Sequence, residues 1–89
     1  MLNDKIAIVT GAASGIGYAV AQALRQEGAQ VVMADVNEAL LRESARKLGG
    51  VPFVGNLTKR EDCRQLVDFT AQRFGRIDIL ANVAGVQHV

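Results

Sequence analysis

Short apolar runs alternate with longer stretches of mixed polarity along the chain. The segments Lys5 to Thr10 ("KIAIVT") and Gln30 to Val36 ("QVVMADV") are almost continuously apolar and rich in β-branched residues. This pattern is typical of strands that are buried on both faces. "VPFVG" (Val51 to Gly55) fits a third strand, and "IDILANVAG" (Ile77 to Gly85) fits a fourth that runs into a loop. The sequence therefore predicts four strands.

Two of the intervening segments have apolar residues at the spacing of a helix. The first pattern follows the glycines after Thr10 and ends at Gly28. We expect the following residues of this helix to face the core: Ile16, Ala19, Val20, Ala23 and Leu24. The second pattern begins at Asn37 and Glu38, which is a typical helix start. We expect its inward residues to be Leu41, Ala45 and Leu48.

A third helix is expected to run to about Phe74. "TKRE", Thr58 to Glu61, has the spacing of a capping box, in which the hydroxyl and the carboxylate each accept a hydrogen bond from a free backbone amide. The residues expected on the inward side of this helix are Cys63, Leu66, Val67, Thr70 and Phe74. Cys63 is accordingly interpreted as a core residue.

The order of these elements, βαβαβαβ with short connections, determines the fold class. Such alternation gives parallel strands joined by right-handed crossovers, with helices on both faces of the sheet. We expect a three-layer α/β fold whose parallel sheet has the strand order 3-2-1-4.

Composition limits the classes of function. The 89 residues suffice for one small domain, and 49% hydrophobic with 21% charged residues is ordinary for a soluble globular chain. A net charge of +1 without a Lys/Arg cluster argues against nucleic acid as a partner. The N-terminal segment resembles neither a signal peptide nor a membrane span. The lone cysteine can form neither an internal disulfide nor a zinc site, so no metal is expected and a reducing, cytoplasmic location fits best.

The segment "TGAASGIG", Thr10 to Gly17, places three glycines between the first strand and the first helix. Gly11 lets the chain turn out of the strand, Gly15 lets a pyrophosphate approach the backbone, and Gly17 lets the helix and sheet pack closely. The free amides of the helix start attract a phosphate, and the Ser14 hydroxyl can add a hydrogen bond. A tight turn without a ligand is the alternative.

Asp35, at the end of the second strand, favours a loop that binds a nucleotide over a tight turn without a ligand. It stands eighteen positions after Gly17, where a carboxylate can accept hydrogen bonds from the hydroxyls of an adenosine ribose. The alternative is an acidic residue that only precedes a helix. The same carboxylate would repel a 2′-phosphate, and Ala13 provides no basic side chain to offset that repulsion. The sequence therefore predicts NAD rather than NADP, on a Rossmann-type fold.

With these features in place, the chain resembles the N-terminal part of a short-chain dehydrogenase/reductase. The matching motifs are "TGAASGIG" for TGxxxGIG, Asp35, "GNLT" around Asn56, and "NVAG" (Asn82 to Gly85) for NNAG. The resemblance covers essentially all 89 residues. In two places the chain departs from the family pattern, with Asn56 instead of an Asp and Val83 instead of the second Asn.

The resemblance assigns roles along the cofactor. It implies that backbone near Ser14, Ile16 and Gly17 holds the pyrophosphate, and that Asn56 and Leu57 meet the adenine edge. Three residues would line a ribose, namely Asn82, Ala84 and Gly85. An alternative for Asn82 is a buried side chain that braces the sheet, and both roles are compatible.

The last residues, "AGVQHV", are similar to those of D-3-hydroxybutyrate dehydrogenases. That similarity implies that Gln87 donates a hydrogen bond to a substrate carboxylate, the alternative being a solvated loop residue. His88 receives no role. The family's chemistry uses Tyr-x-x-x-Lys with a Ser, but the one tyrosine, Tyr18, has Gln22 four positions later. The sequence therefore predicts no catalytic residue in this chain.

We interpret residues 1–89 as the dinucleotide-binding part of an NAD-dependent dehydrogenase whose catalytic part is absent. When complete, the enzyme would act on a secondary alcohol such as 3-hydroxybutyrate. The alternative is a free-standing nucleotide-binding or interaction module without activity. The open edge of the fourth strand favours a homo-oligomer.

Overall fold

The structure, a computed structural model, describes residues 1–83 and contains a four-stranded parallel sheet. Its strand order, β3-β2-β1-β4, confirms the expected topology. The strands are β1 (Ile6–Thr10), β2 (Gln30–Asp35), β3 (Val51–Val54) and β4 (Ile79–Asn82). β1, β2 and β3 are each one residue shorter than their apolar runs, and β4 begins two residues after the start of its run. Strand boundaries follow backbone hydrogen bonding rather than hydrophobicity.

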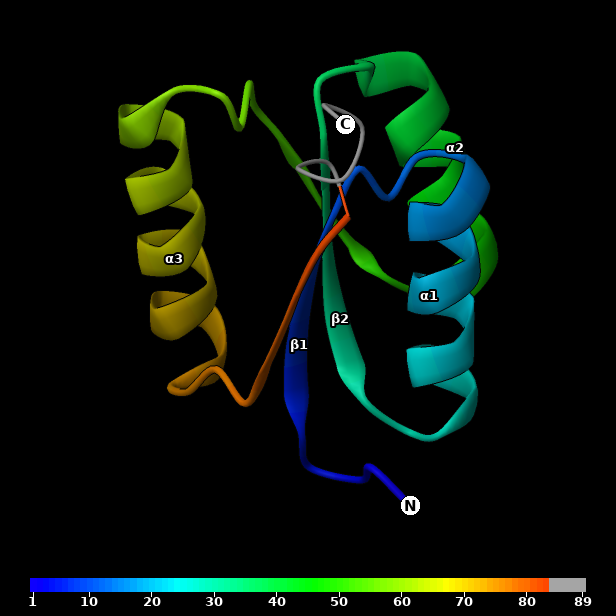
Figure 1. Cartoon of the computed structure of the whole chain (residues 1–89). Helices are drawn as coiled ribbons and strands as arrows, with labels where there is room; N and C mark the ends of the chain where they lie inside the picture. Colours follow the sequence, from blue (N-terminus) through cyan, green and yellow to red (C-terminus); the bar gives the residue numbers. More distant parts are fainter. Residues whose placement is uncertain (84–89) are drawn as a thin grey trace.

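Three helices cover the two faces of the sheet (Figure 1). They are α1 (Gly15–Gln26), α2 (Glu38–Leu48) and α3 (Arg60–Phe74). α1 and α2 lie on one face and α3 lies on the other. The loops that follow β1, β2 and β3 all lie at the upper end in Figure 1, as parallel strands require.

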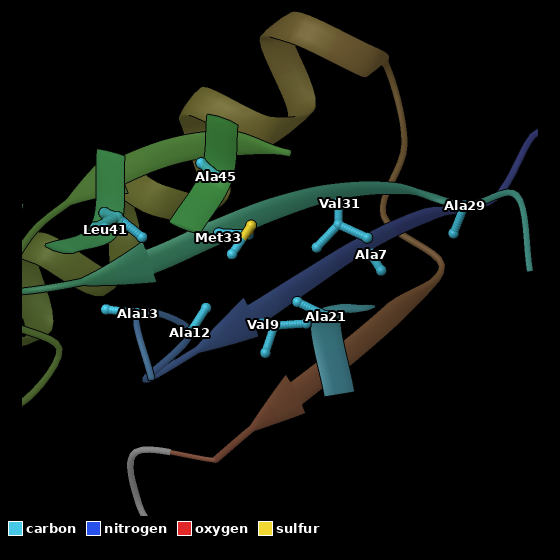
Figure 2. Packing of buried hydrophobic residues seen from close by; sticks show 10 residues of the cluster. All are labelled: Ala7, Val9, Ala12, Ala13, Ala21, Ala29, Val31, Met33, Leu41 and Ala45. Atoms are coloured by element: carbon cyan, nitrogen blue, oxygen red, sulfur yellow. The ribbon is translucent and has the colours of Figure 1, made fainter. Parts of the chain in front are cut away.

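Alternate residues of the central strands supply two separate cores. On the α1 and α2 side, Val9 and Met33 belong to a cluster of ten buried residues that Figure 2 shows. On the α3 side, Ile8 and Val32 pack with Leu66. Because successive strand residues point to opposite faces, a continuous apolar run serves both helical layers.

The inward face of α1 agrees with the expected one only in part, since Val20 and Leu24 pack against the core. Ile16, Ala19 and Ala23 are exposed, and the buried residues are Gly17 and Ala21. Ala21 packs in the cluster between the helix and the sheet, and Gly17 contacts the glycine loop, where the Gly11 carbonyl leaves no room for a Cβ. The apolar spacing alone misplaced the face by giving Ile16 a place in the core.

α2 starts where the sequence predicts, with Asn37 as its N-cap residue. The side chain of Asn37 accepts a hydrogen bond from the Leu40 amide at 3.2 Å, as an N-cap residue should. The other end of the helix is held by Arg25 of α1, whose guanidinium donates to the carbonyls of Leu48 and Ala29, each at 2.9 Å. A cation at the last carbonyls of a helix is also favoured by the helix dipole.

The expected capping box of α3 is wrong. Lys59 is the N-cap residue, and no side chain caps the helix. The Thr58 hydroxyl instead donates to Asn56 Oδ1 at 2.6 Å, and Glu61 accepts from Arg64 at 2.7 Å. Because the helix begins after Lys59, Thr58 lies one residue before the N-cap position, and its hydroxyl bonds within the preceding turn instead.

The buried side of α3 also differs at one position. Leu66 and Thr70 are buried as expected, whereas Val67 is 46% exposed. Phe69 lies on the buried side instead, with its ring 5.4 Å from that of Phe53 on β3. The aromatic ring of Phe69 thus packs against β3 in place of Val67. Within residues 1–83, no helix is both long and apolar enough to cross a membrane.

Asp78 ties the start of β4 to the start of β1. Its carboxylate accepts hydrogen bonds from the Ile6 amide at 2.9 Å and from the Arg76 guanidinium at 2.6 Å. Its own amide donates to the Ile6 carbonyl at 2.8 Å. The hydrogen bond from Arg76 first, and then that from Ile6, holds the pKa of Asp78 below its usual value.

We expect this tie to make stability depend on acid pH. Because the folded-state pKa is lower than the unfolded value of about 3.9, the contribution is complete above about pH 4 and is lost as the pH falls further. Asp78→Asn should therefore lower Tm at pH 7, and the difference from the wild type should shrink in acid. Thermal unfolding from pH 7 to pH 2 measures this. Glu43→Gln, which removes an exposed carboxylate 3.7 Å from Lys47, is the control. A Tm difference between Asp78→Asn and the wild type that stays the same at pH 2 would contradict the expectation.

Candidate functional site

The glycine loop joins the end of β1 to the start of α1. Gly11 and Gly15 have φ values of 65° and 61°, in the left-handed region that favours glycine. Apart from its chain neighbours and the adjacent helix backbone, a Cβ built at Gly15 would meet no atom of residues 1–83 within 4 Å. The space beside Gly15 is therefore not filled by the described chain.

Gly17 has a different reason to be glycine. A Cβ at this position would collide with the carbonyl oxygen of Gly11 and lie 2.6 Å from its carbonyl carbon. The close contact is between the first turn of α1 and the loop, whereas the sequence had suggested contact with the sheet. Gly17 therefore allows the loop to fold tightly over the helix start.

The first amides of α1 have no acceptor among residues 1–83. Ser14 is the N-cap residue, but its side chain makes no capping hydrogen bond. No described group accepts from the amides of Gly15, Ile16 or Gly17, and the first turn contains no acidic residue. These amides and the helix dipole together give a partial positive charge that favours an anion.

A hollow of about 510 Å³ lies against this helix start. Its lining joins the first turn of α1 to the end of β4, two segments far apart in sequence. The lining residues are Ser14, Gly15, Ile16, Gly17, Ala81, Asn82 and Val83. The structure thus brings together the predicted residues Ser14, Gly15, Ile16, Gly17 and Asn82 around one space.

Asn82 also braces the sheet. Its side-chain oxygen accepts a hydrogen bond from the hydroxyl of Thr10 at 2.9 Å, and the two residues are paired neighbours on β4 and β1. Thr10 is buried, whereas Asn82 is exposed. The bracing role expected as an alternative is therefore present, at the edge of the hollow.

Asp35 lies outside the lining of the hollow and holds backbone amides. One carboxylate oxygen accepts from the Ala13 amide at 3.0 Å, and the other accepts from Val36 at 2.7 Å and Asn37 at 3.3 Å. An ionised carboxylate has about four acceptor positions. Three amides therefore leave about one acceptor position for a ligand.

Asn56 and Leu57 follow β3 and do not line the hollow either. The side-chain oxygen of Asn56 accepts from both the backbone amide and the hydroxyl of Thr58. The backbone amide of Asn56 donates to the carboxylate of Asp62. Leu57 is partly buried and packs against the cluster on the α3 side of the sheet. The side chains that the sequence assigned to adenine are thus engaged within the chain.

Three other predicted residues, Ala84, Gly85 and Gln87, lie outside the described residues. Sequence reasoning also missed one residue that contacts the loop. The hydroxyl of Ser44 on α2 donates to the Ala13 carbonyl at 2.7 Å. Ser44 could have been found because it is a polar residue among the inward-facing positions of α2, between Leu41 and Ala45.

Comparison with known proteins gives consistent sequence matches. A model of the family described as short chain dehydrogenase matches residues 5–89. Zerumbone synthase from Zingiber zerumbet is 42% identical over 89 residues, which cover 96% of this chain and 33% of that protein. A 3-oxoacyl-(acyl-carrier-protein) reductase from Thermotoga maritima is 40% identical over 90 residues, which cover 96% of this chain and 37% of that protein.

A solved structure matches as well. The crystal structure of 3-ketoacyl-(acyl-carrier-protein) reductase from Brucella melitensis complexed with NADH has a TM-score of 0.85 and 30% identity. The match covers 90% of this chain and 34% of that one, so the chain spans about one third of the length of these relatives. Because the family match extends over nearly all of the sequence, the chain belongs to the short chain dehydrogenase family.

Proposed function

We propose that the glycine loop and the first turn of α1 bind the diphosphate of NAD. The observation that carries this proposal is the set of amides at Gly15, Ile16 and Gly17, which have no acceptor among residues 1–83 and line the hollow. A diphosphate fits this place because it brings negative charge to the positive end of the helix. The empty space beside Gly15 supports the same ligand.

We propose NAD rather than NADP. Asp35 would accept a hydrogen bond from a ribose hydroxyl with its remaining acceptor position, and its charge would oppose a 2′-phosphate. The segment from Gly11 to Gly17 contains no Lys or Arg to neutralise that phosphate. The solved relative from Brucella melitensis is complexed with NADH, which agrees with this choice.

The complete reaction would be hydride transfer between NAD and a secondary alcohol, with 3-hydroxybutyrate as the candidate substrate. The nicotinamide supplies the hydride chemistry when the cofactor is bound. The residues of this chain would hold the cofactor, with Asn82, Ala84 and Gly85 along a ribose and Asn56 and Leu57 towards the adenine. Gln87 would orient the substrate carboxylate. Tyr18 is not assigned as the acid, because the chain has no Tyr-x-x-x-Lys.

Calorimetric titration of the chain with NADH and with NADPH tests the proposal. We expect NADH to bind at least about tenfold more tightly, which corresponds to ~1.4 kcal/mol. Tighter binding of NADPH would overturn the role of Asp35. Failure of both dinucleotides to bind at millimolar concentration would overturn the diphosphate site itself.

A further inference from the structure

Ser44 is a buried polar residue whose hydrogen bond reaches the glycine loop. It is 5% exposed, and its hydroxyl donates to the carbonyl oxygen of Ala13, which lies 31 residues earlier in the chain. Thr70, another buried hydroxyl, bonds to the Leu66 carbonyl within its own helix. Ser44 instead places its hydroxyl on a carbonyl of the loop, so this buried hydrogen bond joins α2 to the loop.

Ala13 is held through both of its backbone polar groups. Its carbonyl accepts from Ser44 at 2.7 Å, and its amide donates to Asp35 Oδ2 at 3.0 Å. The preceding amide, of Ala12, donates to the Ala34 carbonyl of β2 at 3.1 Å. The loop is thus attached to α2 and β2 immediately before the N-cap residue Ser14.

This attachment matters because glycines stand on both sides of it. Gly11 and Gly15, on either side, have access to many backbone conformations. Ala13 itself is 3% exposed, so removing the Ser44 hydroxyl would leave its carbonyl without this donor in a place that solvent hardly reaches. The peptide would then have to turn towards water, and the amides that follow it would change direction.

We infer that Ser44 is a positioning residue for the anion site, acting through Ala13. It fixes the peptide before α1, so that the amides of Gly15, Ile16 and Gly17 stay directed away from the chain's own acceptors. The consequence for cofactor affinity rests on the proposed function. The restraint on the loop does not, and can be measured without a ligand.

The test compares Ser44→Ala with Thr70→Val. Both variants remove one buried hydroxyl, but only the Ser44 hydroxyl contacts the loop. Amide hydrogen exchange of Ala13, relative to the core amide of Val32, reports the loop, while thermal unfolding reports global stability. In Ser44→Ala we expect the Ala13 amide to exchange about tenfold faster relative to Val32, and NADH to bind about tenfold more weakly.

The possible outcomes are distinct. Faster Ala13 exchange and weaker NADH binding in Ser44→Ala, with neither change in Thr70→Val, would support the inference. Ser44→Cys, with a weak donor in place of the hydroxyl, should then give intermediate values. Unchanged relative exchange of Ala13 in Ser44→Ala would overturn it, as would equal effects of the two variants. If the wild type binds no dinucleotide but Ala13 still exchanges faster in Ser44→Ala, the proposed function fails while the loop restraint stands.

Discussion

Gly17→Ala should weaken NADH binding by more than about tenfold, because the loop over the start of α1 can no longer close. The added Cβ would meet the carbonyl oxygen of Gly11, which belongs to the backbone and cannot rotate away as a side chain could. Alanine favours a helix by about 1 kcal/mol over glycine, but overpacking typically costs about 1–3 kcal/mol. We therefore expect a lower Tm as well as weaker binding, measured by thermal unfolding and calorimetric titration.

Ala19→Gly is the control for this variant. Ala19 is exposed on the same helix, so the change should cost about 1 kcal/mol of helix stability without touching the loop. Its NADH affinity should stay close to that of the wild type. If Ala19→Gly lost as much affinity as Gly17→Ala, general loosening of α1 would explain both results and the account of Gly17 would fail.

Asp35→Asn should weaken NADH binding by about 10- to 100-fold, which corresponds to hydrogen bonds to a charged group worth about 1.5–3 kcal/mol. An amide has a single oxygen, whereas the carboxylate of Asp35 uses one oxygen for Ala13 and the other for Val36 and Asn37. At least one of these attachments is lost in the variant. The substitution should therefore loosen the loop in addition to removing the charge that we propose for the ribose contact.

This double role predicts that Asp35→Asn will not become a tight NADPH binder. Titration with both dinucleotides, together with hydrogen exchange of the Ala13 amide, measures the two effects separately. Asp68→Asn, on the exposed side of α3 with Arg64 at 3.7 Å, is the charge-matched control and should change neither. If Asp35→Asn bound NADPH tightly and its Ala13 amide exchanged at the wild-type rate, Asp35 would act only on the ribose and not on the loop.

The strand order and the layers of the fold could be predicted because the relevant signals are local. Runs such as Ile6–Thr10 and Gln30–Asp35 are buried on both faces, and a continuous apolar run has few other interpretations. The rule for right-handed crossovers then restricts the topology. Asn37 could be assigned as a helix cap for the same reason, since its hydrogen bond reaches only three residues along the chain.

The details that could not be predicted depend on packing between distant residues. The burial of Gly17 and the exposure of Ile16 follow from how closely α1 approaches the loop and sheet, which spacing alone does not encode. Thr58 has the right spacing for a cap, but α3 begins after Lys59, and the Thr58 hydroxyl bonds to Asn56 in the preceding turn. In both cases a tertiary or neighbouring contact overrides a valid local preference.

The candidate site shows the same division. The glycines and Asp35 could be selected from their spacing after a strand, because that spacing places them at one edge of a parallel sheet. The hydrogen bond that Asp35 accepts from the Ala13 amide depends on the position of β2 relative to the loop, and the contact of Ser44 with Ala13 depends on the position of α2. Sequence reasoning thus found the candidate ligand contacts but missed the residues that shape them.

The central claim is that the amides at the start of α1 receive the diphosphate. The most direct test is an amide NMR titration of the isotope-labelled chain with NADH. The account predicts saturable shifts at Gly15, Ile16 and Gly17, with smaller changes at amides on α3 such as that of Asp68. Saturable binding that leaves these three amides unshifted would contradict it.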